Sequence, residues 1–282
     1  MKKNVISFMN MKGGVGKSTL CVNIAHCLSM HFNKKVLLID IDPQFNATQY
    51  LLPQHKYIED VYGQNQTIHK IFQERNLKPS LVDGVVETDI QELSGLEYDI
   101  NDNLSLIPGD LRMVNVEKSS ATGREHKLTK YIEKNGSKEN FDFIFIDCPP
   151  TQSIYTLAAF YASNFYLMPV KPDFLSVLGI SLFQNAIKEY NEELPHKIKC
   201  LGMIFTLAQE RTNHGSAKMN EIREKYKLYT FDNYMKHSIK VPEHAENNTC
   251  LYDMGEDFRK NIVDLTTEFL NAYNNEVGGS KQ

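Results

Sequence analysis

The feature that most constrains this chain is a glycine-rich turn between a strand-like segment and a helix-like segment. Val5–Met9 is apolar, the turn Lys12–Thr19 reads Lys-Gly-Gly-Val-Gly-Lys-Ser-Thr, and a helical pattern follows at Ser18–Phe32. Glycines let the backbone adopt left-handed angles and come close to a bound anion. A helix N-terminus adds unpaired N–H groups that also favour an anion. This order of segments predicts a phosphate-binding loop, and an incidental glycine turn is the weaker interpretation.

The same turn carries side chains suited to a nucleotide and its metal ion. Lys17 is placed to reach the β- and γ-phosphates, and the Ser18 hydroxyl is placed to hold Mg²⁺. The usual P-loop pattern has glycine where this chain has Met11, and it leaves the next position open. We expect a nucleotide to contact the whole turn, namely Lys12, Gly13, Gly14, Val15, Gly16, Lys17, Ser18 and Thr19.

Aspartates follow two of the buried strand-like segments. Val36–Asp40 leads to Asp42 two residues later, and Phe143–Asp147 leads into a Cys-Pro-Pro sequence. Ligands of open α/β sheets bind at the carboxyl ends of the strands. Apolar residues that end in an aspartate are typical of a Walker B strand, so we expect Asp147 to hold the Mg²⁺ shell through water. Capping of the chain turn is the alternative role for Asp40 and Asp42.

Short apolar runs alternate with longer helical patterns, which is typical of a parallel sheet covered by helices. The runs are apolar on both faces, as buried parallel strands are. We predict strands at Val5–Met9, Val36–Asp40, Leu104–Ile107, Phe143–Asp147, Phe165–Pro169 and Cys200–Thr206. We predict helices at Ser18–Phe32, Arg124–Asn135, Ile154–Ala162, Leu175–Asn191, Asn213–Lys227 and Glu256–Glu276. The expected fold class is α/β, a mostly parallel, doubly wound twisted sheet flanked by helices.

The chain has no internal repeat and no evident linker, so we expect a single domain over residues 1–282. Residues 53–103 are polar and irregular, which predicts a surface excursion with a helix such as Thr67–Asn76. The polar tail over residues 274–282 is expected to fray.

Composition excludes several classes of protein. Apolar residues are 41% and charged residues 23% of the chain, the balance of an ordinary globular protein. Gly and Pro together are only 25 residues, which argues against collagen-like and disordered proteins. The net charge of −4 gives no overall attraction to nucleic acid or anionic lipid, so such binding needs a local patch. The cysteines form no C-x-x-C pair, the histidines have no metal-ligand spacing, and no apolar run is long enough for a membrane span. We therefore expect a cytoplasmic protein with reduced thiols.

The glycine turn and the aspartate segments together resemble the ParA/MinD family of deviant Walker A ATPases. Lys12–Thr19 resembles the family's Walker A box, Asp40–Thr48 its Asp-x-Asp-Pro-Gln-x-Asn-Ala-Thr segment, and Asp147–Pro150 its Asp-Cys-Pro-Pro box. Phe45 stands where glycine is common in the family. The resemblance covers about residues 3–265. It implies a P-loop NTPase fold of the deviant Walker type, with ATP and Mg²⁺ as cofactors.

The resemblance also implies roles for single residues. Lys12 crosses a dimer interface to touch the phosphates of the partner's nucleotide, where negative charge builds up during phosphoryl transfer. Asp42 orients or activates the attacking water, and Asp40 supports the metal side. The implied catalytic set is Lys12, Lys17 and Asp42, and the implied metal set is Ser18, Asp40 and Asp147. The family's strand end at Thr206 lies beside the adenine, so Thr206 joins the nucleotide-binding set.

A basic segment in the C-terminal half is the candidate DNA-binding surface. In ParA proteins the arginine matching Arg211 contacts DNA, and Lys236–Glu243 resembles the family's Arg-x-Ser-Val-x-x-x-Glu region with lysine replacing arginine. Residues 211–240 contain seven basic and three acidic side chains. A solvated helix face is the plainer interpretation of such a run. The resemblance favours binding of double-stranded DNA, without sequence preference, through Arg211, Lys218, Lys236 and Lys240.

The resemblance implies that this chain is closest to the ParA-type ATPases that partition plasmids or chromosomes. Such a protein forms a homodimer with ATP, binds DNA in that state, and hydrolyses ATP slowly until a ParB-like centromere-binding protein stimulates it. We expect it in the cytoplasm, and on the nucleoid when ATP is bound. Eleven residues precede Lys12, so we expect no N-terminal helix-turn-helix and no operator binding.

Other functions fit this sequence less well. A MinD-like membrane switch needs a C-terminal amphipathic helix, and residues 274–282 have no apolar face with basic flanks, so we expect no membrane partner. A family member that positions another cargo or assists conjugation would share the same ATPase residues. A metabolic P-loop enzyme or an iron–sulfur reductase is the remaining class, and the reductase would need a cysteine pair where only Cys148 lies near the site.

Overall fold

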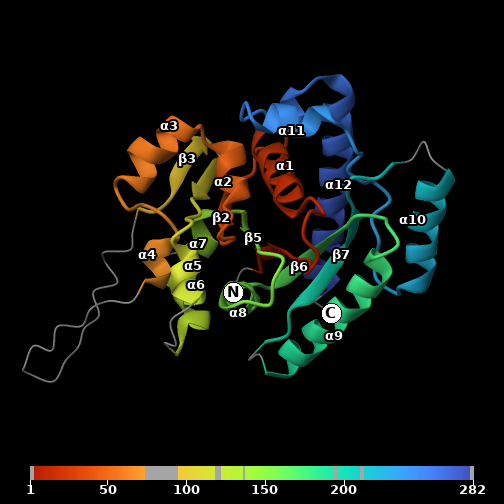
Figure 1. Ribbon diagram of the computed structural model, residues 1–282, viewed down its shortest axis with the longest axis horizontal. Coiled ribbons are helices and arrows are strands. Elements are labelled where there is room, and N and C mark those ends of the chain that lie inside the picture. The colour runs from red at the N-terminus through yellow and green to blue at the C-terminus, as the bar shows by residue number, and fades with distance from the viewer. Residues whose placement is uncertain are drawn as a thin grey trace, which may run out of the picture.

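A seven-stranded sheet forms the centre of the molecule in the computed structural model (Figure 1). The structure describes residues 3–73, 95–117, 122–135, 137–193, 196–209 and 213–279. The strand order is β3-β4-β2-β5-β1-β6-β7, and every neighbouring pair is parallel except β3 and β4. The strands are β1 Val5–Phe8, β2 Val36–Asp40, β3 Tyr98–Asn101, β4 Leu104–Ile107, β5 Phe143–Asp147, β6 Phe165–Val170 and β7 Lys199–Phe205.

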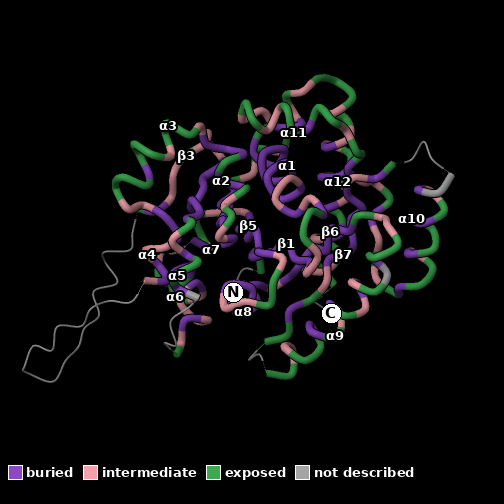
Figure 2. Tube along the Cα trace, in the orientation of Figure 1, coloured by how far each residue is buried: buried purple, intermediate pink, exposed green. Residues whose placement is uncertain are grey.

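The strands direct alternate side chains into two hydrophobic layers, as the pleat of a sheet requires. Ile144 and Ile146 of β5 belong to one layer, and Phe143 and Phe145 belong to the other. The first layer also takes residues from α4, α5, α6, α8, α9 and α10, and the second takes residues from α1, α2 and α12. Figure 2 shows buried strands between helices whose outer sides are exposed. The expected α/β class, a doubly wound and mostly parallel sheet with helices on both faces, is confirmed.

Helices of unequal length make up these two covering layers. The longer ones are α1 Lys17–Met30, α6 Lys127–Lys134, α8 Ile154–Ala162, α9 Ser176–Glu193, α10 Asn213–Lys225 and α12 Glu256–Gly278. The shorter ones are α2 Asn46–Leu51, α3 Gln54–Lys56, α4 His69–Phe72, α5 Met113–Glu117, α7 Ser137–Asn140 and α11 Lys240–Ala245. The described residues also form a π-helix, η1 Tyr57–Tyr62, and the 3₁₀ turns η3 Arg124–His126 and η4 Leu251–Asp253. Within the described ranges, none of the helices is both long and apolar enough to cross a bilayer.

The register of the central strands brings their carboxyl ends level with one another. Phe8 of β1 pairs with Asp147 of β5, and Asp40 of β2 pairs with Asp147 from the other side. All residues of β2 and β5 are buried, so these strands hold their terminal aspartates rigidly. The loops after β1, β2 and β5 therefore leave the sheet at one edge, which is where open α/β sheets bind ligands.

Local predictions succeeded in the buried strands and failed at the edges. The predicted bounds of β2, β4, β5 and α8 match the structure at both ends. The expected helix Thr67–Asn76 is α4 His69–Phe72 in the part that the structure describes, and β3 was not predicted.

The expectation that the tail frays from residue 274 was wrong up to Gly278, where α12 ends. Val277 packs against the second hydrophobic layer, and Lys199 Nζ lies 3.2 Å from Glu276 Oε2. These two contacts stabilise the last turn of α12.

Candidate functional site

The turn between β1 and α1 has a backbone that glycine adopts readily and other residues rarely do. Gly14 has φ 67°, and Gly16, the N-cap of α1, has φ 78°. A Cβ on Gly16 would lie 3.3 Å from Met235 Cε. Thr206 Oγ1 donates a hydrogen bond to the Val15 carbonyl oxygen and supports the turn from behind. The turn is thus a well-supported loop at the N-terminus of α1, where the helix dipole stabilises an anion.

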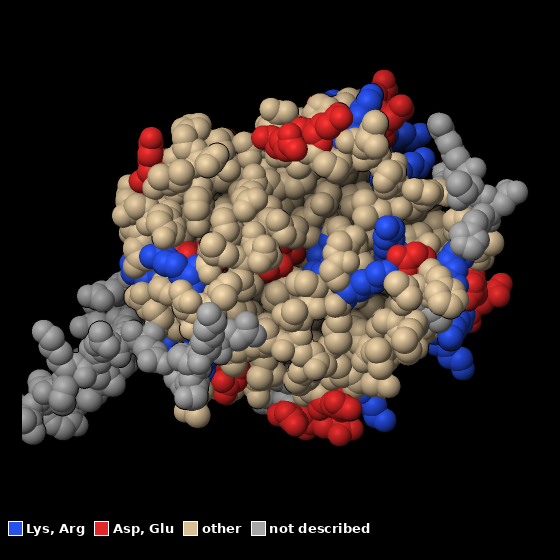
Figure 3. Space-filling view, viewed as in Figure 1, with Lys and Arg blue, Asp and Glu red and all other residues tan. Residues whose placement is uncertain are grey.

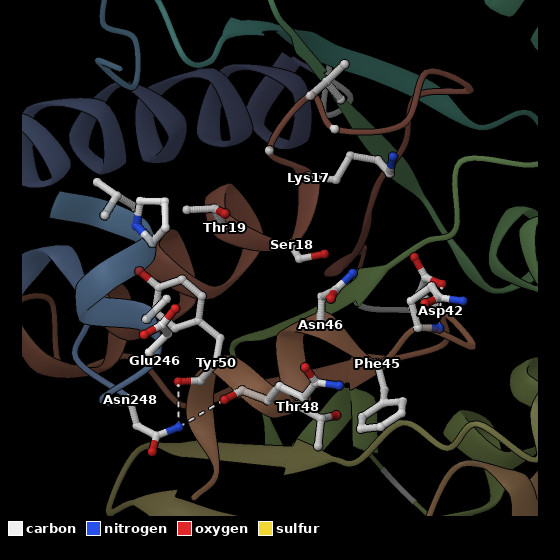
Figure 4. Close-up of a pocket in the computed structure, with 18 of the residues that line it drawn as sticks. Lys17, Ser18, Thr19, Asp42, Phe45, Asn46, Thr48, Tyr50, Glu246 and Asn248 are labelled. Carbon is white, nitrogen blue, oxygen red and sulfur yellow. Dashed lines mark hydrogen bonds between the residues drawn. The ribbon is translucent and has the colours of Figure 1, made fainter. Parts of the chain in front are cut away.

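Lys17 lies at the base of this loop, with only 7% of its surface exposed. Its Nζ donates to the Lys12 carbonyl oxygen at 3.2 Å. Burial lowers the pKa of Lys17, and the charges of Asp147 and Asp42 act in the opposite direction. In Figure 4, Lys17 and Ser18 lie opposite Asp42 and the other residues of the turn after β2. A cation and two carboxylates therefore face one another at the foot of the loop.

The two strand-end carboxylates, Asp40 and Asp147, are fully buried. Thr48 donates to Asp40 Oδ2 from its N–H at 2.8 Å and from its hydroxyl at 2.7 Å. Asp40 Oδ1 and both Asp147 oxygens have no partner at hydrogen-bond geometry among the described residues. Burial raises the pKa of Asp147 to about 7, and the Ser18 hydroxyl acts to lower it. Buried carboxylate oxygens without donors are costly unless a cation or a donor meets them.

The oxygens of Asp147 and Ser18 suit a Mg²⁺ ion that keeps most of its water better than a metal ion coordinated only by protein side chains. Over the part of the chain that is described, no group of three or more His, Cys, Asp or Glu side chains is arranged to hold a metal. Mg²⁺ usually keeps several waters and takes one or two carboxylates together with substrate phosphates. The unpartnered oxygens of Asp147 and the nearby Ser18 hydroxyl are oxygen ligands of the kind that Mg²⁺ takes. Asp40, bound to Thr48 through one oxygen, supports them from the next strand.

Asp42 lies two residues beyond β2, in a turn that its own oxygens help to close. Its Oδ1 accepts from the Gln44 N–H at 2.9 Å, and its carbonyl oxygen accepts from the Phe45 N–H at 2.8 Å. Burial raises the pKa of Asp42, although the Gln44 hydrogen bond and the Lys17 charge act to lower it. The Asp42 side chain lines the cavity beside the P-loop. A carboxylate with a raised pKa at this place can orient a water and accept its proton.

A cavity of about 1280 Å³ lies beside Lys17, Ser18 and Asp42. Its wall consists of the P-loop, the turn and α2 after β2, the segment from Met235 to Ile239, and α11. Leu207 and Met235 lie against Gly16 and give this end of the cavity an apolar surface. Small-molecule sites usually measure about 300–1,000 Å³ and combine apolar walls with a few polar groups. The cavity therefore has room for a nucleoside triphosphate, with an apolar seat for the base.

Lys12 points away from this cavity and pairs with Asp173 instead. Its Nζ lies 2.6 Å from both carboxylate oxygens of Asp173. Asp173 also accepts hydrogen bonds from the Ser176 N–H at 3.0 Å and the Ser176 hydroxyl at 2.9 Å. Lys12 N–H donates to Asn10 Oδ1, which fixes the backbone just before the loop. The extra lysine of the loop is thus held within the same chain by Asp173, just before the start of α9.

Comparison with known proteins identifies the family. The AAA domain family model matches residues 3–200. The sporulation initiation inhibitor protein Soj of Bacillus subtilis (strain 168) is 29% identical over 94% of this chain and 97% of its own length. The chromosome partitioning protein ParA of Caulobacter vibrioides is 23% identical over 89% of this chain and 87% of its own length. This chain belongs to the ParA-type P-loop ATPases.

A solved structure has the same fold as this ParA-type ATPase. The crystal structure of a plasmid partition protein from Borrelia burgdorferi B31 bound to AMPPNP matches with a TM-score of 0.73. The match covers 98% of this chain and 100% of that chain at 22% identity, which shows the shared fold alone.

Most of the expected site residues of this ParA-type ATPase gather at one place. Gly14, Val15, Gly16, Lys17, Ser18, Thr19 and Asp42 line the cavity. Asp40 and Asp147 end the neighbouring strands β2 and β5. Lys12, Gly13 and Thr206 are not part of the cavity wall: Lys12 faces Asp173, and the buried Thr206 supports Val15.

The candidate DNA-binding residues do not share one environment. Lys236 and Lys240 are exposed, and both flank the α11 side of the cavity. Lys218 on α10 is 8% exposed, and its Nζ lies 2.8 Å from Glu221 Oε2. Arg211 lies outside the described residues. In Figure 3, Lys and Arg side chains gather over the part of the molecule that holds α10 and α11, with Asp and Glu among them.

Sequence reasoning did not single out several residues around the site. Leu207 and Met235 flank Gly16, Tyr57 stacks on Phe45, and Asp173 pairs with Lys12. Phe45 in place of the family's glycine was the one sequence signal here, because a large ring at this position needs a side chain to pack against. No sequence signal connects Lys12 with Asp173, because 161 positions separate them.

Proposed function

We propose that this chain is a DNA-partition ATPase that uses ATP and Mg²⁺ to switch between two assembly states. With ATP it forms a homodimer that binds duplex DNA without sequence preference, and slow hydrolysis returns it to the monomer. The observation that carries the proposal is that Lys17, Asp42 and Asp147 meet at the foot of one glycine loop. The partition proteins among its relatives support DNA segregation as the purpose of this cycle.

In this proposal the P-loop backbone and Lys17 bind the phosphates of ATP. Ser18 and Asp147, the latter through water, would hold Mg²⁺, which would supply positive charge against the negative charge that develops on the phosphate oxygens. Leu207 and Met235 form the apolar seat for the adenine. Thr206 acts on the nucleotide through the Val15 carbonyl rather than by direct contact.

Asp42 orients the water that attacks the γ-phosphorus and accepts its proton. The new bond forms between the water oxygen and phosphorus, and the bond to the β–γ bridging oxygen breaks, so that ADP and inorganic phosphate leave. Burial raises the pKa of Asp42, which makes its carboxylate a better proton acceptor than an exposed aspartate.

Lys12 completes this site only from a second subunit. In its own subunit it reaches Asp173 and does not line the cavity. Directly after Asp173, the large apolar side chains of Phe174, Leu175 and Leu178 are 81%, 66% and 65% exposed. Apolar side chains gathered on a surface commonly mark a contact with another molecule. Their place beside Lys12 supports a subunit interface on this side.

DNA contact follows from the same dimerisation. Exposed Lys236 and Lys240 offer phosphate contacts beside the cavity mouth, and Arg211 is proposed to add another. Lys218 contributes least in this proposal, because Glu221 neutralises it. A few lysines bind DNA weakly, and pairing two subunits raises the effective concentration of the second contact.

The proposed cycle needs a regulator and a place to work. A ParB-like protein bound to the DNA cargo is proposed to stimulate hydrolysis, and the ATP-bound dimer is proposed to sit on the nucleoid in the cytoplasm. Stimulation by such a regulator is consistent with a site that needs Lys12 from a second subunit before it is complete.

ATP turnover with and without duplex DNA tests the ATPase directly. We expect slow Mg²⁺-dependent release of phosphate, lowered by about a hundredfold or more in Asp42→Ala with ATP binding retained. Lys17→Ala is expected to weaken both binding and turnover. Asp102→Ala, at an exposed turn between β3 and β4, is the matched control and keeps the parent rate. Unchanged turnover in Asp42→Ala contradicts the proposal.

A further inference from the structure

Phe45 has a backbone conformation that suits glycine. It is the N-cap of α2 with φ 40° and ψ 41°, in the left-handed region. Its side chain has a Cβ that disfavours these angles, so a phenylalanine here is strained. Strained residues persist where the surrounding structure holds them, and they cluster at functional sites. The residues packed around Phe45 must therefore hold it in this conformation.

The ring of Phe45 is held by a stack on Tyr57. The two ring centroids are 5.4 Å apart with an angle of 13° between the planes. Tyr57, the first residue of η1, is anchored in turn because its hydroxyl donates to the Gly109 carbonyl oxygen at 3.1 Å. A Cβ on Gly109 would lie 2.5 Å from Phe45 Cβ, so the absence of a side chain at Gly109 makes room for Phe45.

The stacked pair is connected to the carboxylates of Asp40, the last residue of β2, and of Asp42, two residues beyond it. The Phe45 N–H donates to the Asp42 carbonyl oxygen, and the neighbouring Gln44 N–H donates to Asp42 Oδ1. On the other side, the Gly109 N–H donates to Thr48 Oγ1 at 2.8 Å, and Thr48 donates to Asp40. Phe45 thus lies between the hydrogen bonds that hold Asp42 and the hydrogen bonds that hold Asp40.

We propose that the Phe45–Tyr57 stack is a positioning device that fixes the direction of the Asp42 carboxylate in the cavity. Both rings line the cavity wall, and Figure 4 shows Phe45 beside Asp42. Glycine at position 45 would relieve the backbone strain, but the turn over residues 42–45 would lose the support of the Phe45–Tyr57 stack. The inference rests on the proposed ATPase function, in which Asp42 acts on the water.

Steady-state kinetics of matched variants tests the proposal. Phe45→Gly and Tyr57→Leu remove the stack, and Phe45→Tyr keeps two stacked rings together with the Tyr57 hydroxyl. We expect the first pair to lower kcat by about tenfold to a hundredfold with KM nearly unchanged, because misplacing a catalytic group costs rate rather than binding. Phe45→Tyr is expected to keep kcat within about twofold of the parent. A Phe45→Gly protein with the parent kcat overturns the proposal.

Amide hydrogen exchange tests the same idea without relying on turnover. The Gln44 N–H bonds to Asp42 Oδ1, so its protection reports where the carboxylate lies. We expect the Gln44 amide to exchange about tenfold faster in Phe45→Gly than in the parent or in Phe45→Tyr. Equal exchange in all three overturns the proposal. A parent chain that shows no Mg²⁺-dependent turnover contradicts the ATPase function, while the exchange comparison still decides whether the stack positions Asp42.

Discussion

Lys12 and Asp173 form an ion pair in which the ammonium lies 2.6 Å from both carboxylate oxygens. Burial acts to raise the pKa of Asp173, but the hydrogen bonds from Lys12 and Ser176 outweigh it, and the pKa is lowered overall. The carboxylate is therefore ionised at neutral pH. A lysine that is to reach a partner's nucleotide must first leave this pair, so Asp173 competes with the second subunit for Lys12.

Removing the charge of Asp173 is expected to favour the ATP-bound dimer. Asp173→Asn keeps the size of the side chain but no longer attracts Lys12. A partly exposed ion pair contributes at most about 1 kcal/mol, so the ATP concentration for half-maximal dimerisation is expected to fall by about two- to fivefold. Light scattering across an ATP titration measures this change.

Two controls make the Asp173 result specific. Asp102→Asn removes a charge from an exposed turn far from α9 and is expected to leave the titration unchanged. In a Lys12→Ala background, Asp173→Asn should have no further effect on assembly. An identical titration for the parent and Asp173→Asn shows that the pair does not restrain Lys12.

Charge reversal at Lys236 and Lys240 is expected to weaken DNA binding and leave assembly intact. Both side chains are exposed; Lys236 lines the rim of the cavity, and Lys240 is the first residue of α11. The double variant Lys236→Glu with Lys240→Glu should bind duplex DNA at least about tenfold more weakly near 0.1 M salt. The parent's log affinity should fall with log salt at a slope of about −0.9 for each phosphate contact, and the variant's slope should be shallower.

Lys130→Glu with Lys134→Glu is the matched control for this experiment. These lysines are exposed on α6 with the same spacing, on the layer of helices that covers the other face of the sheet. If the two double variants lose DNA affinity equally, the binding follows net charge and the proposed surface is wrong.

Asp110 is expected to contribute to the acid sensitivity of the fold. Its buried carboxylate accepts from Thr67 Oγ1 at 2.6 Å and from Arg112 Nε at 2.9 Å. Burial acts to raise the pKa of Asp110, but the bonds from Arg112 and Thr67 lower it below its ordinary value. Because the folded-state pKa is below the unfolded one, this stabilisation is present above about pH 4 and is lost as pH falls through the folded-state value.

Urea unfolding at several pH values measures this contribution. At pH 7, Asp110→Asn is expected to lower the free energy of unfolding by about 1–3 kcal/mol, the cost of a weakened buried hydrogen-bond network. Between about pH 5 and 2 the variant should lose stability less steeply than the parent. Parallel curves for the two proteins would mean that Asp110 does not titrate differently on unfolding.

The sequence predicted best what the buried strands determine. The apolar runs that end in Asp40 and Asp147 predicted β2 and β5 to the residue, because a strand buried on both faces leaves little freedom in composition. The Gly13–Lys17 turn predicted the loop, because its left-handed angles at Gly14 and Gly16 select glycine.

What the sequence did not predict depends on contacts between distant residues. The edge strand β3 is polar and antiparallel, and half of its positions are Asp or Asn, which are uncommon in strands. The pair of Lys12 with Asp173 and the stack of Phe45 on Tyr57 arise only when separate loops meet at the sheet edge. Neither leaves a local pattern.

Molar mass under light scattering tests most directly whether ATP assembles two subunits through Lys12. Asp42→Ala, which is expected to bind ATP without hydrolysing it, keeps the nucleotide state constant during the measurement. With Mg²⁺ and ATP we predict twice the 32.4 kDa of one chain, and with ADP a single chain. Adding Lys12→Ala should abolish the dimer while the monomer still binds nucleotide. A mass that is the same with ATP and ADP, or a Lys12→Ala protein that still dimerises with ATP, would contradict the proposed switch.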